Sequence, residues 1–98
     1  MSIRKNITKL DISRKNLKNS LKLEGFVNLK ELDCFGNEIT HLEIINCPLL
    51  EEVYCAANKI VDLNVKGCSY LKRLCAYSNL LTSLDLSQNN GLEELKHR

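Results

Sequence analysis

Residues 29–39 read LKELDCFGNEI, and the same pattern returns as LEEVYCAANKI at residues 50–60 and as LKRLCAYSNLL at residues 71–81. Each copy follows the form L-x-x-L-x-C-x-x-N-x-L, in which Val or Ile can replace Leu and Ala can replace Cys. The copies are 21 residues apart, as three asparagines mark most clearly: Asn37, Asn58 and Asn79. Constant spacing of this length predicts a solenoid in which every copy builds one coil.

The flanking sequence extends the pattern in both directions. Each copy continues with a second alternating apolar pair, namely Leu42 and Ile44, Leu63 and Val65, and Leu84 and Leu86. An earlier copy begins at Ile7, with Lys15 at the asparagine position and one extra residue near Ser20, and a last copy begins at Leu92. Residues 1–98 are therefore predicted to form one domain of four full repeats and a partial one, at residues 7–28, 29–49, 50–70, 71–91 and 92–98.

The alternation of apolar and polar positions around residues 32–34 predicts a short strand in each coil, and equivalent strands should stack into a parallel sheet. The second apolar pair predicts a narrower strand ladder or an extended turn on the opposite side. A repeat of 21 residues leaves too little room for a long helix as well. The expected fold class is thus a repeat solenoid with a parallel β-sheet on one face, short strands or turns on the other, and little α-helix.

These motifs resemble the leucine-rich repeat family, and especially its short 21-residue, cysteine-bearing variety in bacterial internalin-like proteins and in repeat arrays of fungal signalling proteins. The resemblance covers over nine tenths of the chain. It implies that the parallel sheet lies on the concave face and that its exposed strand face binds proteins. Lys15 and the extra residue near Ser20 depart from the pattern, and both lie in a terminal repeat, where atypical capping sequence is expected.

The recurring asparagines and cysteines are interpreted as structural ladders. At each corner of a coil the backbone loses ladder partners, and a side-chain amide can both donate to and accept from those groups. Four cysteines are expected as buried free thiols: Cys34, Cys47, Cys55 and Cys68. Disulfides between equivalent cysteines of adjacent coils are the alternative, disfavoured because parallel side chains point the same way. The two histidines fall at unrelated positions of the pattern, so no metal or cofactor is expected.

The outward positions of the strands form the candidate protein-binding face. Aromatic side chains on a rigid sheet, surrounded by charges, are typical of interaction hot spots. The alternative is that strand propensity alone placed the aromatic residues there. The face is predicted to consist of Glu31, Asp33, Phe35, Glu52, Tyr54, Arg73, Cys75 and Tyr77. Arg73 is expected to favour the thiolate of Cys75, but no histidine is placed to assist it, so a non-catalytic module that binds an unidentified protein is predicted.

Charge distribution suggests a second function. The net charge is only +2, but residues 1–22 carry seven basic residues against the single acid Asp11. Binding of nucleic acid or anionic lipid through this first repeat is the alternative function, disfavoured because the acidic middle of the chain repels phosphate. The basic residues concerned are Arg4, Lys5, Lys9, Arg14, Lys15, Lys18 and Lys22.

The ends of the sequence suggest location and assembly. No stretch approaches the roughly 20 apolar residues that cross a bilayer, and the first residues lack the apolar run of a secretory signal, so a cytoplasmic protein is expected. The last copy stops within its strand, which leaves Leu92 and Leu95 on an open coil. We therefore expect either a segment of a longer array or self-association through Leu92 and Leu95, edge to edge, in a dimer.

Overall fold

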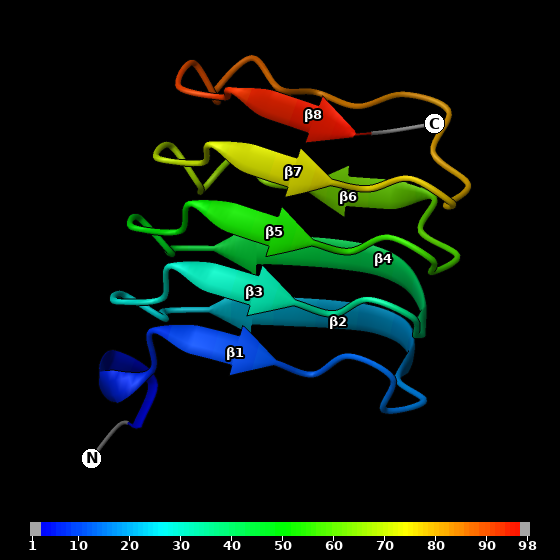
Figure 1. Cartoon of the computed structure of the whole chain (residues 1–98), viewed down its shortest axis with the longest axis horizontal. Coiled ribbons are helices and arrows are strands. Elements are labelled where there is room, and N and C mark those ends of the chain that lie inside the picture. Colours follow the sequence, from blue (N-terminus) through cyan, green and yellow to red (C-terminus); the bar gives the residue numbers. More distant parts are fainter. Residues whose placement is uncertain (1–2, 97–98) are drawn as a thin grey trace.

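The computed structural model describes residues 3–96 as a parallel-strand β-solenoid of about four turns with almost no helix (Figure 1). A single 3₁₀ helix, Ile3–Asn6, precedes the first strand. The strands are β1 (Lys9–Asp11), β2 (Lys18–Glu24), β3 (Glu31–Asp33), β4 (Glu38–Ile45), β5 (Glu52–Tyr54), β6 (Asp62–Asn64), β7 (Arg73–Cys75) and β8 (Glu94–Lys96).

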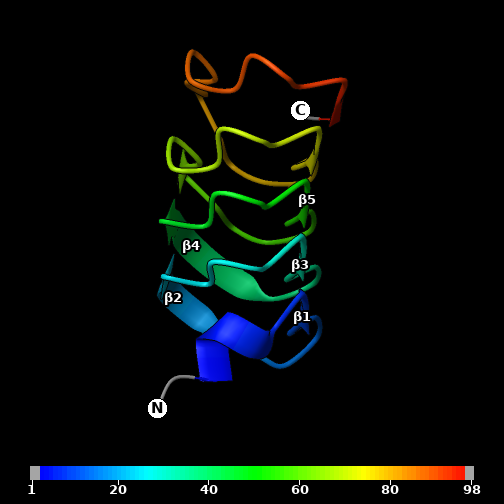
Figure 2. The same cartoon turned by 90° about the vertical axis from the view of Figure 1, so that its left-hand side faces the viewer.

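Two parallel sheets face each other across the core (Figure 2). The first sheet has the order β1-β3-β5-β7-β8, and the second has the order β2-β4-β6. Equivalent residues of successive repeats pair in register, as in Leu32↔Val53 and Val53↔Leu74. The predicted solenoid with two strand ladders is therefore confirmed.

The second sheet differs in detail from the narrow ladder expected. Its first two strands, β2 and β4, have seven and eight residues, whereas every strand of the first sheet has three. The register of β2 against β4 shifts between Asn19 and Ser20, because these consecutive residues pair with Ile39 and His41 and bypass Thr40 of β4. The extra residue of this bulge therefore lies on β4, and regular pairing continues on either side of it.

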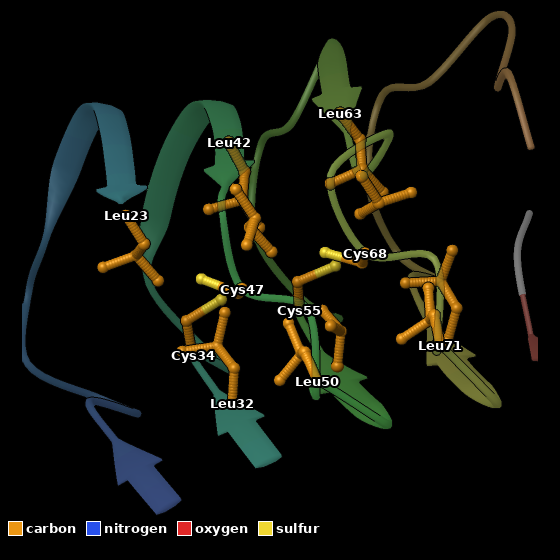
Figure 3. Packing of buried hydrophobic residues seen from close by; sticks show 14 of the residues in the cluster. Leu23, Leu32, Cys34, Leu42, Cys47, Leu50, Cys55, Leu63, Cys68 and Leu71 are labelled. Atoms are coloured by element: carbon orange, nitrogen blue, oxygen red, sulfur yellow. The ribbon is translucent and has the colours of Figure 1, made fainter. Parts of the chain in front are cut away.

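The core is a column of aliphatic side chains between the two sheets (Figure 3). Four cysteines are completely buried in it, namely Cys34, Cys47, Cys55 and Cys68, and all five cysteines are free thiols. The expected free buried thiols are therefore present. Burial from solvent raises the pKa of Cys34 and of Cys68 to about 12, so these thiols are neutral apolar fillers.

The repeating asparagines close one corner of every coil. Asn58 accepts a hydrogen bond from the Ile39 amide at 3.1 Å and donates to the carbonyl oxygens of Cys34 and Cys55 at 3.0 and 3.1 Å. Asn37 and Asn79 repeat this arrangement in the coils on either side. Each asparagine thus links its own coil to the preceding one, which confirms the structural interpretation.

The residue before each of these corners adopts a left-handed conformation. The four equivalent positions have φ between 52° and 73°: Arg14, Gly36, Ala57 and Ser78. Only one of the four is glycine, the residue for which this region carries no steric cost. The solenoid therefore holds three ordinary residues in a backbone conformation that each disfavours.

Candidate protein-binding face

The outer face of the first sheet consists of two rows of side chains that alternate with a central row of leucines and one valine. One row runs Lys9, Glu31, Glu52, Arg73, Glu94, and the other runs Asp11, Asp33, Tyr54, Cys75, Lys96. The alternation follows from the pleat, because successive side chains of a strand point to opposite sides. Six of the eight residues of the predicted binding face therefore lie in these two rows, on β3, β5 and β7 (Figure 1).

The other two, Phe35 and Tyr77, lie just beyond the strands in a third row with Ala56 between them. The ladder continues here, since the Arg14 amide donates to the Phe35 carbonyl and the Ala57 amide donates to the Tyr77 carbonyl. Tyr77 is 42% exposed, whereas Ala56, which the strand alternation places outward, is 1% exposed. The small Ala56 side chain lies in a recess between two large neighbours, so outward position did not give exposure there.

The guanidinium of Arg14 covers part of Phe35. Its central carbon lies 5.2 Å from the centre of the Phe35 ring, a cation–π distance. Arg14 belongs to the basic first repeat, so one of the charges considered for phosphate binding is directed onto the candidate face instead. The repeating pattern placed Phe35 on this face, but it gave no signal for the cover that Arg14 provides.

A chain of polar contacts crosses the middle of the face. The Tyr54 hydroxyl donates to Glu52 Oε1 at 2.5 Å, and Arg73 donates to Glu52 Oε2 at 2.9 Å. Arg73 also lies 3.4 Å from Glu94. The hydrogen bond to the Glu52 carboxylate raises the pKa of Tyr54 to about 12. Tyr54 is thereby held neutral and fixed in position, with its hydroxyl already occupied by Glu52.

Cys75 is half-buried beside this chain, and its environment does not activate it. Burial raises the pKa of the Cys75 thiol, and the opposing attraction of nearby Lys96 is weaker than this effect. The expectation that Arg73 favours the thiolate is therefore wrong. A thiol is a poor nucleophile in the neutral form, and the raised pKa keeps Cys75 in that form at neutral pH.

The hollows of the surface are small or shallow. A hollow of about 50 Å³ lies among Tyr54, Cys75 and Lys96 on the outer face, and such a volume holds a few water molecules at most. A larger groove of about 270 Å³ runs over the second sheet, past Lys22, His41 and Asp62. The repeat pattern gave no signal for this groove, which lies over the outward positions of the second ladder and reaches Leu21 and Leu42 between them. Among residues 3–96, no three His, Cys, Asp or Glu side chains gather to hold a metal ion.

The basic residues of the first repeat do not gather on one face. Lys9 lies on the first sheet, 3.5 Å from Glu31, whereas Lys22 lies on the second sheet, 3.8 Å from Glu24. Lys15 follows Arg14 in the corner between the sheets, and Lys18 begins β2 on the second sheet. The side chain of Arg4 lies outside the described residues. A spread of this kind divides the positive charge between opposite sides of the coil.

Comparison with known proteins adds no identification. No protein family, curated protein or solved structure matches the chain. In the part of the chain that the structure describes, no helix is both long and apolar enough to cross a membrane.

Proposed function

We propose that this protein is a non-catalytic leucine-rich repeat module that binds another protein through the outer face of its first sheet. The single observation that carries the proposal is the placement of Phe35 and Tyr77 along one border of a face whose backbone is fixed by parallel pairing. Rigid aromatic side chains bind at low entropic cost, because little freedom remains to be lost.

The charges beside the aromatic row suggest the chemistry of the partner. Glu31, Asp33 and Glu52 lie toward the first coils, while Arg73 and Lys96 lie toward the last ones. A partner with an apolar anchor over Tyr77 and a basic group over Asp33 fits this pattern. The neutral Cys75 thiol supports a binding role rather than a catalytic one.

The family assignment rests on the 21-residue pattern and on the role of each position in it. The leucines of the pattern are buried in the middle coils, the asparagine closes the corner, and the short strand precedes it. We also retain the proposal of a cytoplasmic location, which the five free thiols support because a reducing compartment keeps thiols free. Self-association through Leu92 and Leu95 is part of the same proposal; Leu95 is 42% exposed and Leu92 packs partly against the core.

Binding of nucleic acid or anionic lipid by the first repeat remains the alternative function. The separation of Lys9 and Lys22 onto opposite sheets disfavours it, because phosphate contacts need several cations on one surface. Affinity for a short DNA or for anionic vesicles that falls steeply between low and moderate salt, together with no protein partner, would favour this alternative over protein binding.

The test compares two tyrosines of similar exposure. Tyr77, on the face, is 42% exposed, and Tyr70, which precedes β7 and lies away from the face, is 48% exposed. Affinity capture with the native chain, Tyr77→Ala and Tyr70→Ala should yield a protein that Tyr77→Ala alone loses, at moderate salt. A captured set that is identical for all three chains would contradict binding through this face.

A further inference from the structure

The two end coils each present a strand edge that no described residue pairs with. On β8, the Glu94 amide donates to the Lys72 carbonyl at 3.0 Å, and the Lys96 carbonyl accepts from Ala76 at 2.6 Å. Backbone groups of a strand point alternately to its two neighbours. The amide and carbonyl of Leu95 therefore point away from β7, toward open solvent (Figure 1).

On β1, the backbone groups that point away from the sheet complement those of the open β8 edge. The Thr8 carbonyl accepts from Glu31 at 3.2 Å, and the Ile12 amide donates to Asp33 at 2.8 Å. The backbone groups of Lys9 and Asp11 therefore point away from β3. The 3₁₀ helix leaves this edge open, because it lies beyond the start of β1 (Figure 1). The Lys5 carbonyl accepts a hydrogen bond there from the Asn28 side chain at 2.7 Å.

We propose that β8 binds β1 of a second copy of this chain, so that copies stack head to tail with the strands parallel. The register of the first sheet, carried one strand further, sets Glu94 opposite Lys9 of the second copy. It also sets Leu95 opposite Leu10, and Lys96 opposite Asp11, of the second copy. Both charged positions of the three-residue strand are thereby matched with opposite charges.

The proposed contact repeats pairs that the sheet already contains. Lys9 lies 3.5 Å from Glu31, and Arg73 lies 2.9 Å from Glu52, each across one strand spacing in the same row. Opposite charges on neighbouring strands stabilise a sheet modestly and like charges destabilise it. Because the unpaired backbone groups of β8 and β1 match, the contact also forms backbone hydrogen bonds at Glu93 and Leu95. It covers the exposed part of the Leu95 side chain as well.

A two-fold contact between β8 and a second β8 also matches charges, since Glu94 then faces Lys96, but it fits the second sheet less well. The second sheet ends at β6, and the segment beyond it, where Ser83 and Asp85 lie beside Asp62 and Asn64, forms no strand. A two-fold contact sets two such irregular segments against each other.

The size of the end coils sets the strength of the contact. The molecule extends 36 Å along the strands and 16 Å between the sheets (Figure 1), so each end offers roughly 500 Å², less than the about 800 Å² of a standard interface. Association should be weak, and a contact between two different surfaces leads to open growth. Stacking leaves the outer face free and lengthens it beyond the roughly 300 Å² that one copy presents.

This inference rests on the proposed self-association but not on the proposed protein partner, and charge exchange tests it. The head variant is Lys9→Glu with Asp11→Lys, and the tail variant is Glu94→Lys with Lys96→Glu. Each is measured by sedimentation velocity up to about 0.5 mM, the range that suits weak contacts, and far-ultraviolet circular dichroism verifies the fold. A control exchanges Glu38 and Lys59, a pair 3.6 Å apart in the middle coils, through Glu38→Lys with Lys59→Glu.

The native chain and the control should associate, and each end variant alone should associate at least about tenfold more weakly. An equal mixture of the two end variants should recover the association of the native chain. Recovery follows because the exchanged head then meets the exchanged tail. Undiminished association of the tail variant would show that β8 pairs with itself, which overturns the head-to-tail contact but keeps self-association. A native chain that stays at 11.2 kDa overturns both. Loss of association in the control, or no recovery in the mixture, also overturns the assignment.

Discussion

Replacement of Asn58 by alanine tests the role of the corner asparagines in stability. The Asn58 side chain is 8% exposed and forms hydrogen bonds to the backbone of its own coil and of the coil before it. Alanine keeps the backbone conformation available and removes only the amide. Any loss of stability therefore measures what the amide contributes to the corner.

The magnitude follows from the groups left behind. The Cys34 carbonyl also accepts from Asn37, and the Cys55 carbonyl also accepts from Asn79, so each keeps one donor in the variant. The Ile39 amide loses the acceptor that Asn58 Oδ1 provides. The Ala56 carbonyl, to which Asn58 also donates, keeps the Gly36 amide as a donor. A buried amide left without a partner costs about 1–3 kcal/mol, and the three weakened carbonyl contacts add some tenths each. We expect Asn58→Ala to lower the free energy of unfolding by about 2–3 kcal/mol.

Urea unfolding followed by circular dichroism measures this difference. With a denaturant dependence of about 1–3 kcal/mol per molar urea, the midpoint should fall by about 1 M or more. The control is Asn64→Ala, because Asn64 lies on β6 and accepts only one hydrogen bond, from the Lys66 amide in an exposed turn. The control should change stability by no more than about 0.5 kcal/mol. Equal midpoints for the two variants would refute the corner assignment.

Three further outcomes are expected. Titration of the native chain with a thiol reagent should label Cys75 first among the five cysteines, because the other four are buried; rapid labelling of all five would contradict the burial. Ala57→Gly should raise stability by about 0.5–1 kcal/mol in urea unfolding, since φ at Ala57 is 57°, whereas Ala56→Gly should lower it. Because the pKa of Tyr54 is raised from 10.0 to about 12, its hydrogen bond should stabilise the fold below pH 10 and cease to do so as the pH rises to about 12. Glu52→Gln should shift the phenol absorbance titration of Tyr54 to lower pH, and an unchanged titration would show that Glu52 is not the cause.

The repeating pattern was sufficient to predict the solenoid because each position of the repeat has one physical role in every coil. Leu32, Val53 and Leu74 share one buried site, so evidence from three copies adds up to a single assignment. The extra residue near Ser20 was also visible, because it shifts every later position of the first repeat. The register shift that bypasses Thr40 of β4 keeps Leu21 and Leu23 of β2 paired with Leu42 and Ile44.

The details of the candidate face depend on side-chain size and contact, which a repeat pattern does not contain. The pattern placed Ala56 outward like Phe35 and Tyr77, but a methyl group between two large rings is hidden from solvent. It also placed Cys75 beside Arg73 without showing that the guanidinium is directed to the carboxylates of Glu52 and Glu94. These contacts decide which side chains of the face already have partners within the chain.

One buried residue escaped sequence analysis although the spacing contained the signal. Asn89 follows Cys47 and Cys68 at the same interval and is 4% exposed. Its amide donates to the carbonyls of Val65 and Cys68 at 3.1 and 2.9 Å, and its Oδ1 has no partner among the described residues. In the fourth coil, Asn89 thus stands where the second and third coils have Cys47 and Cys68, and the core becomes thinner there.

The thinning of the core connects stability with assembly. Leu42 in the second coil is 1% exposed and Leu63 in the third is 7% exposed, while the equivalent Leu84 in the fourth is only half-buried. In a solenoid each coil is stabilised mainly by its neighbours, so a coil with one covered side is the least stable. The last coil therefore gains most from a second copy placed against β8. The same surface that weakens the isolated chain gives the proposed stacking its favourable free energy.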